Sequence, residues 1–245
     1  LYPIVGLFAI LSSTGYLICG IREFKRSAEI ISRHKETKRQ NLADNTNTDI
    51  SSAKKLEAPK FCRHTLVALL LGFLFLYVGM EVMYGTFVAT FAVESSLNLT
   101  RQEAARVNAI FWGSFAAMRF AAIFIAFKLS VLSQMVFSFA LCVIGSVALA
   151  TAGNIYTYVL CIGSALMGFG MASVFACGIL WLEQYVTVTN KIGSFMIISG
   201  SIGADLFPII LGQFMAKFPM LLMYLQVIVV FMCVILFGVA YFCRT

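Results

Sequence analysis

Leu66–Val93 reads LVALLLGFLFLYVGMEVMYGTFVATFAV, and Glu81 is the only charged side chain among these 28 residues. Roughly 20 apolar residues in succession are enough for a helix to cross a bilayer. Backbone polar groups inside lipid must bond within the segment, so this stretch predicts a transmembrane helix. Glu81 then lies at membrane depth, where an ionisable group is costly and normally faces a bundle interior or a watery cavity.

Six further stretches are apolar enough to cross a membrane. They lie at about 1–20, 104–127, 131–151, 155–181, 192–215 and 219–243. The chain of 245 residues is 60% hydrophobic and only 12% charged, which excludes a soluble globular domain. The stretches do not alternate polar and apolar residues as the strands of a membrane barrel do. The sequence therefore predicts an all-α membrane protein with seven spans, each a helix.

The basic residues indicate the orientation in the membrane. Segment 21–63 holds 11 of the 18 Lys and Arg and six acids. With this segment in the cytoplasm, 14 basic residues lie inside and 3 outside, as the positive-inside rule requires, and the C-terminus is cytoplasmic. The net charge of +7 thus indicates topology and contact with a lipid bilayer, and no nucleic-acid partner is expected. Asn98, in the only N-x-S/T acceptor sequence, falls outside and is a candidate glycosylation site.

We expect three parts in the chain. Residues 1–20 are predicted to be one transmembrane helix, 21–63 a partly disordered cytoplasmic linker, and 64–245 a six-helix bundle. The chain begins inside an apolar run without a Met, so we expect it to be the end of a longer protein. The seven Cys lack metal-ligand spacing, and no catalytic motif or phosphate-binding glycine loop is present. We expect no enzyme, no metal site and no cofactor, apart from a coupling ion such as Na⁺ or H⁺.

Three polar side chains of the second span form the main candidate site. Tyr77, Glu81 and Tyr84 lie at positions i, i+4 and i+7, which share one face of a helix. A carboxylate between two phenols suits a polyhydroxylated ligand, because the rings offer apolar faces and the oxygens accept hydroxyl protons. The alternative is that both tyrosines pack in the bundle and Glu81 pairs with an internal cation.

Two further charges lie deep within predicted spans. Arg119 is the natural partner of Glu81 for a polar or coupling pair, although its long side chain could instead reach the inner headgroups. Asp205 can share a face with Ser194 and Ser201, and Pro208 nearby favours a kink. Asp205 therefore either binds a coupling cation or ligand, or supports that kink.

The predicted span 155–181 carries small residues and a polar end. Gly163, Gly168 and Gly170 favour close packing of this helix against its neighbours. Trp181, Glu183 and Gln184 lie at its cytoplasmic end and indicate an interface belt and a gate contact.

A lone span, a basic linker and six spans resemble the middle and end of a major facilitator superfamily transporter. That fold implies twelve helices in two bundles, each built from inverted three-helix repeats, with the solute bound between the bundles. The chain would supply the sixth helix, the linker and the complete C-terminal six-helix bundle. Spans 65–93 and 155–181 would then be equivalent, and both would border the cavity.

Several short strings resemble the sodium-dependent glucose transporter branch of that superfamily, a relative of bacterial fucose permeases. They are Tyr77-Val-Gly-Met-Glu81-Val, Ile110-Phe-Trp-Gly113, Arg119-Phe120, Trp181-Leu-Glu183-Gln-Tyr185 and Gly200-x-x-Gly203. The resemblance implies a monomeric, multi-pass plasma-membrane carrier of a hexose such as glucose, either sodium-coupled or a facilitator, that works by alternating access. Two alternatives stay open: a carrier of another small solute or organic anion with Arg119 as counter-ion, and a non-transporting receptor or adaptor that docks partners through 21–63.

Overall fold

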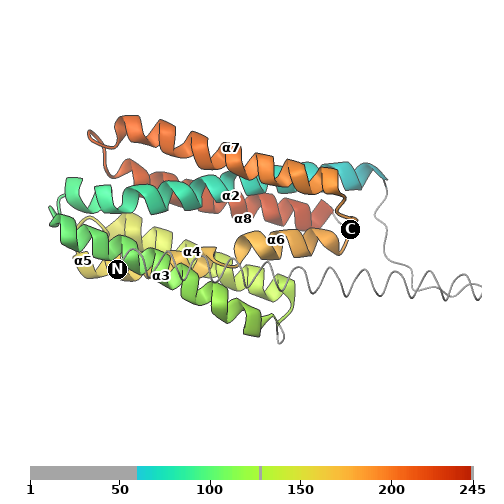
Figure 1. Cartoon of the computed structure of the whole chain (residues 1–245), viewed down its shortest axis with the longest axis horizontal. Coiled ribbons are helices and arrows are strands. Elements are labelled where there is room, and N and C mark those ends of the chain that lie inside the picture. The colour runs from blue at the N-terminus through green and yellow to red at the C-terminus, as the bar shows by residue number, and fades with distance from the viewer. Residues whose placement is uncertain (1–59, 127–128, 244–245) are drawn as a thin grey trace, which may run out of the picture. The chain divides into compact units, whose positions relative to one another are not determined.

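The computed structural model describes residues 60–126 and 129–243 of the chain (Figure 1). The predicted first span, 1–20, lies outside the described residues, and so does nearly all of the predicted linker, 21–63. These two parts of the domain organisation therefore stay predictions.

The described part is entirely helical. Its helices are α2 (Lys60–Glu94), α3 (Arg101–Ile125), α4 (Val131–Ala152), α5 (Thr157–Met171), α6 (Val174–Glu183), α7 (Asn190–Phe214) and α8 (Leu221–Cys243). The pair α5 and α6 together make one span, so the described residues contain six helical segments long and apolar enough to cross a membrane. The six predicted spans from 65 to 243 are confirmed, with ends within a few residues of those expected.

Local side-chain bonds fix where two of the helices begin. The Thr100 hydroxyl accepts from the Glu103 backbone N–H, and the Glu103 carboxylate accepts from the Thr100 N–H, which is a capping box. Ser130 caps α4 in a similar way by accepting from the backbone N–H of Ser133. Short polar turns in the sequence therefore start α3 and α4.

Helix α2 is the centre of the bundle. It packs against α7, α8, α3 and α6, while α5 packs between α3 and α4. Figure 1 shows α7 running along α2, with α3, α4 and α5 on the other side of α2. With 35 residues, α2 is about 52 Å long at 1.5 Å per residue, which is longer than the hydrocarbon core of a bilayer.

Glycines bring the helices close together, as predicted for the fourth described span. A Cβ on Gly170 would lie 2.9 Å from the backbone N of Cys142 and 2.9 Å from the carbonyl oxygen of Ser138, both in α4. A Cβ on Gly163 would meet the side chain of Leu149, and one on Gly168 would meet the backbone of α3. The small residues of this span therefore serve close packing, which confirms that prediction.

The same span contains a break. A helical span over 155–181 was predicted, and the structure has one span there, made of α5 and α6 with a turn at Ala172 and Ser173 between them. Pro208, by contrast, lies inside α7, which continues from Asn190 to Phe214. The interruption therefore falls where the sequence has no proline, and the proline that favoured a kink does not end its helix.

Candidate functional site

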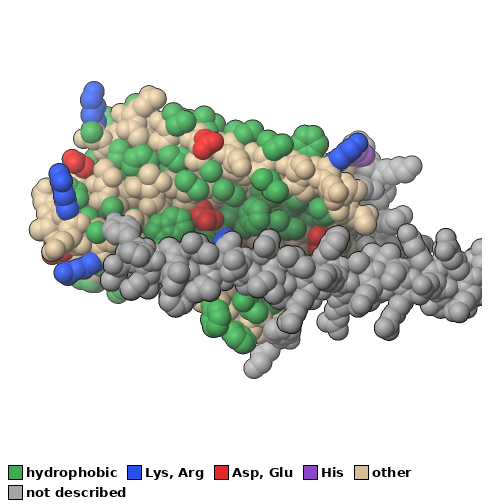
Figure 2. Space-filling view, viewed as in Figure 1, with side chains coloured by type: hydrophobic (Ala, Val, Ile, Leu, Met, Phe, Trp, Pro, Cys, Tyr) green, Lys and Arg blue, Asp and Glu red, His purple; other side chains and the backbone are tan. Residues whose placement is uncertain are grey.

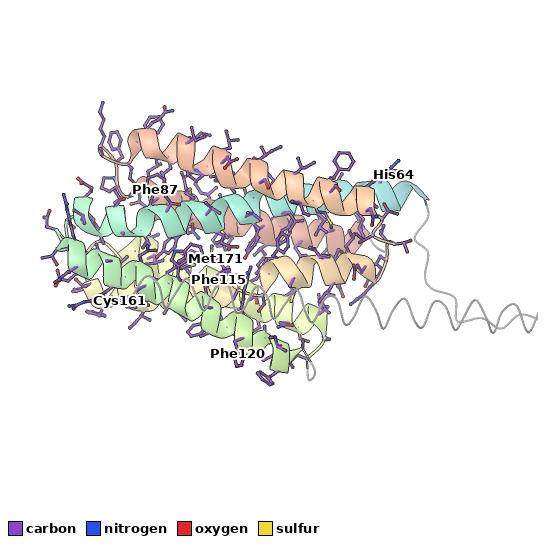
Figure 3. The ribbon with its side chains drawn as sticks, viewed as in Figure 1. His64, Phe87, Phe115, Phe120, Cys161 and Met171 are labelled. Atoms are coloured by element: carbon purple, nitrogen blue, oxygen red, sulfur yellow. The ribbon has the colours of Figure 1, made fainter. Side chains whose placement is uncertain are left out.

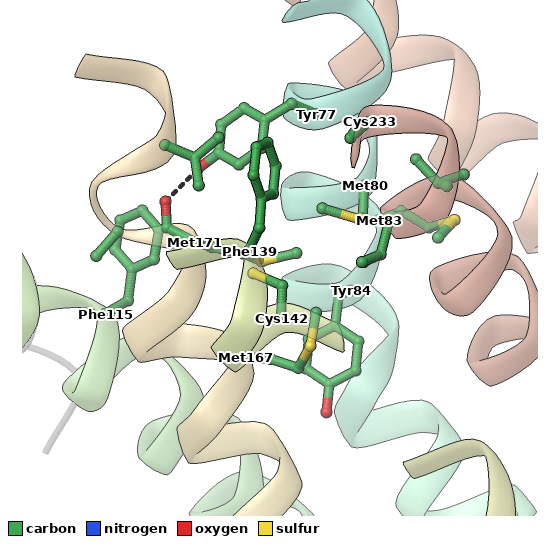
Figure 4. Packing of buried hydrophobic residues seen from close by; sticks show 14 of the residues in the cluster. Tyr77, Met80, Met83, Tyr84, Phe115, Phe139, Cys142, Met167, Met171 and Cys233 are labelled. Atoms are coloured by element: carbon green, nitrogen blue, oxygen red, sulfur yellow. Dashed lines mark hydrogen bonds between the residues drawn. The ribbon is translucent and has the colours of Figure 1, made fainter. Parts of the chain in front are cut away.

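Tyr77 and Tyr84 of α2 project into the hydrophobic core. Both side chains are fully buried. The Tyr77 hydroxyl donates to the backbone carbonyl of Met171 at the end of α5, over 2.5 Å (Figure 4). The Tyr84 hydroxyl shares a hydrogen bond of 2.7 Å with the Ser164 hydroxyl of α5. This is the packing arrangement that the sequence left open as the alternative, and contact of either phenol with a solute stays a prediction.

Glu81 lies between the two tyrosines along the helix but is not sealed in the core. Its side chain is half-buried. Its polar neighbours inside the bundle are Tyr77 and Arg119, whose charge attracts the carboxylate. Glu81 is therefore the least buried of the three predicted residues.

Arg119 of α3 is also half-buried. Its Nε donates to the backbone carbonyl of Ala172 over 3.4 Å, and its guanidinium carbon lies 4.6 Å from the centre of the Phe115 ring. A guanidinium over an aromatic face is a favourable cation–π arrangement. Figure 3 shows Phe115 and Met171 close together near the middle of the bundle, so Arg119 approaches the interruption of the fourth span. A direct ion pair with Glu81 stays a prediction.

Asp205 lies on an exposed flank of α7. Ser194 and Ser201, which were predicted to share its face, are exposed as well. The opposite flank of α7 is held against α2, where the Ser199 hydroxyl donates to the carbonyl of Leu71 over 2.8 Å. A coupling role for Asp205 stays a prediction, but its exposure leaves it available to a partner beyond the described helices.

The polar end of the fourth span differs from the prediction at one residue. Trp181 was expected in an interface belt, but its side chain is 1% exposed and belongs to the core. Its ring lies 5.2 Å from that of Tyr185 and 5.1 Å from that of Phe237. Glu183 and Gln184 are exposed at the end of α6, where a gate contact stays a prediction.

Asn98 lies in the exposed turn between α2 and α3. Its φ of 44° places it in the left-handed region, which Asn adopts more readily than most residues. The turn leaves the side chain accessible, and glycosylation there stays a prediction.

Sequence reasoning missed the backbone at the interruption. The carbonyls of Met171 and Ala172 each accept a hydrogen bond from a polar side chain of another helix. In the sequence, Gly168 and Gly170 indicate close packing at this position but do not indicate an interruption of the helix. Every residue has a backbone carbonyl, so the sequence does not indicate which carbonyls accept a bond from another helix. These two hydrogen bonds therefore could not be predicted.

Together these groups make a polar cluster inside an apolar bundle. Figure 2 shows acidic and basic atoms adjoining near the middle of one face, among hydrophobic side chains. The cluster offers the carboxylate of the half-buried Glu81, one half-buried guanidinium and a buried phenol. Such a set can bind hydroxyl groups or a cation, and no group of three or more His, Cys, Asp and Glu side chains able to hold a metal occurs among the described residues.

The chain is similar to several transporters. It is 36% identical over 172 residues to the human "Sodium-dependent glucose transporter 1", a match that covers 69% of this chain and 32% of that protein. It is 33% identical over 180 residues to the protein of the same name from Xenopus laevis, covering 73% of this chain and 36% of that protein. The chain thus spans about a third of the length of these curated relatives. The sequence matches no protein-family model.

A solved structure has a similar fold. The crystal structure of the Escherichia coli fucose:proton symporter FucP matches with a TM-score of 0.58 and 18% identity, over 80% of this chain and 48% of that chain. At this identity the likeness concerns the fold alone. It agrees with the predicted six-helix bundle of a larger helical transporter fold.

Proposed function

Because the chain belongs to the major facilitator superfamily, as a relative of the sodium-dependent glucose transporter 1 proteins, we propose that it forms part of a carrier that moves a sugar across the membrane by alternating access. It is part of a multi-pass membrane protein, and its relatives are transporters rather than enzymes. The sugar, the coupling ion and the plasma-membrane location belong to this proposal. In it the segment 21–63 and the C-terminus are cytoplasmic, as the distribution of Lys and Arg favours.

The observation that carries the proposal is the half-buried side chain of Glu81 in the middle of an apolar span. A charge at this depth is stable only beside water, a ligand or another polar group. Its neighbours in the bundle are Tyr77 and Arg119, and its side chain is half-buried among the described helices. In the proposal its carboxylate accepts hydrogen bonds from sugar hydroxyls, while the two tyrosines hold the helices together beside it.

Uptake of labelled glucose by the full-length protein tests this role. Glu81→Gln keeps the shape of the side chain and removes its charge. A hydrogen bond to a charged group contributes about 1.5–3 kcal/mol, so we expect uptake at low glucose to fall by roughly 10- to 100-fold. Glu94→Gln is the matched control, because Glu94 is an exposed residue at the end of the same helix. Wild-type uptake by Glu81→Gln, with equal surface expression, would remove Glu81 from the proposal.

The coupling ion needs a separate measurement. Replacing Na⁺ by choline at constant pH should reduce uptake, as the names of the relatives suggest for those proteins. Uptake that ignores Na⁺ but collapses with the proton gradient would assign the coupling to protons. Uptake that depends on neither gradient would make the protein a facilitator.

A further inference from the structure

The interruption of the fourth span leaves backbone groups to be satisfied inside the bundle. Helix α5 ends at Met171 and α6 begins at Val174. The Ala172 N–H still bonds to the Gly168 carbonyl, and the Cys177 N–H bonds to the Ser173 carbonyl. Between these bonds the last carbonyls of α5 lack partners within their own helix. In a membrane an unsatisfied backbone group costs several kcal/mol, so other groups must supply the missing donors.

Two side chains from two other helices supply these donors. Tyr77 of α2 donates to the Met171 carbonyl, and Arg119 of α3 donates to the Ala172 carbonyl (Figure 4 shows the first). Both donors are held in place: the Tyr77 ring is fully buried, and the guanidinium lies over the Phe115 ring. Side chains of α2 and α3, and not residues of the span itself, therefore hold the interruption in place by hydrogen bonds, which we call the brace.

Glu81 can compete as an acceptor for both donors. It lies one turn beyond Tyr77 on the same face of α2, and the charge of Arg119 attracts its carboxylate. A phenol has a single proton, so Tyr77 can donate to the Met171 carbonyl or to the carboxylate, but not to both. An attraction toward Glu81 likewise works against the long bond of 3.4 Å from Arg119 to Ala172. The state of the carboxylate thus influences whether the interruption stays braced.

We propose that Tyr77 and Arg119 are positioning residues that brace the α5–α6 interruption, and that an occupant at Glu81 strengthens the brace. A sugar hydroxyl that donates to Glu81 satisfies the carboxylate, so Tyr77 and Arg119 remain on the two carbonyls. When Glu81 is empty it draws the donors away, and the junction between α5 and α6 opens more often. The link to a sugar rests on the proposed function, but the brace itself does not.

Hydrogen exchange of the full-length protein in lipid nanodiscs tests the brace. The readout is the exchange rate of amides in a peptide covering 168–180, measured with and without glucose. In Tyr77→Phe we expect exchange without glucose to be roughly 3- to 10-fold faster than in the wild type, because the loss of one buried hydrogen bond favours local opening. We also expect the slowing by glucose that the wild type shows to be absent. In Glu81→Gln, exchange should be slow with or without glucose, because the competing charge is gone.

Tyr84→Phe is the matched control. It removes another buried phenol hydroxyl from the same helix, but the partner of Tyr84 is Ser164, inside the continuous part of α5. Exchange over 168–180 should therefore stay at the wild-type rate. If Tyr77→Phe does not fold, Arg119→Gln removes the second donor, and faster exchange is expected there too.

The outcomes separate the brace from the proposed function. Wild-type exchange in both Tyr77→Phe and Arg119→Gln, or an equal rise in Tyr84→Phe, overturns the brace even when glucose uptake is normal. Faster exchange confined to the two brace variants supports the brace even if the protein transports no glucose, in which case only the proposed function fails. If the wild type transports glucose and glucose leaves its exchange over 168–180 unchanged, the coupling through Glu81 is wrong.

Discussion

Replacing Gly170 by alanine should separate α5 from α4 and destabilise the bundle. The added Cβ would lie 2.9 Å from two backbone atoms of α4 and 2.6 Å from the sulfur of Cys142. Ordinary contact begins at 3.4 Å, so the backbone overlap to be relieved is about 0.5 Å. A single backbone atom of a packed helix cannot shift without the rest of the helix. The overlap is therefore relieved only if α5 and α4 move apart.

The expected loss follows from that separation. Overfilling a packed core costs typically about 1–3 kcal/mol, and a gap of about 0.5 Å removes roughly a quarter of the dispersion energy of the atoms on either side. Alanine is better than glycine inside a helix by roughly 0.5–1 kcal/mol, which offsets part of the loss. We therefore expect a net decrease of about 1–2 kcal/mol in the free energy of unfolding, or a Tm lower by about 2–8 °C.

Thermal unfolding of the full-length protein in detergent measures this change. Gly238→Ala is the matched control, because Gly238 lies inside α8 and a Cβ there would meet no atom within 4 Å. That variant should be as stable as the wild type or more stable by up to about 1 kcal/mol. A Gly170→Ala protein with the wild-type Tm, or an equal loss in Gly238→Ala, would refute the reasoning from close packing.

Three further predictions concern single residues. Tyr84→Phe removes the hydrogen bond to Ser164 and should lower the free energy of unfolding by about 0.5–1.5 kcal/mol, measured by the same thermal method. An unchanged free energy of unfolding would mean that this hydrogen bond does not stabilise the bundle. Glu103→Ala removes the acceptor of the Thr100 N–H and should cost about 1 kcal/mol, unlike Glu103→Gln, which can keep the capping box. Asn98→Gln should abolish a glycosidase-sensitive shift in electrophoretic mobility if the turn is extracellular, and a wild-type protein without such a shift would contradict glycosylation there.

The sequence by itself determined which segments cross the membrane. Apolar length is a local property, and the bilayer imposes helices on any such segment, so the six spans of the described bundle followed from hydropathy alone. The packing role of Gly168 and Gly170 also followed, because small residues let membrane helices approach each other closely. The position of Glu81 at membrane depth needed no structure either.

Only the tertiary structure decided how the polar groups are used. Tyr77 meets a carbonyl 94 residues away, and Trp181 is buried because Phe237 of another helix packs on it. No proline marks the interruption at Ala172 and Ser173 in the sequence. The hydrogen-bond donors to its carbonyls come from α2 and α3 and not from the span itself. Helical periodicity indicates which residues share a face of a helix. Which other helix packs against that face depends on contacts between distant segments, and these contacts form only when the bundle assembles.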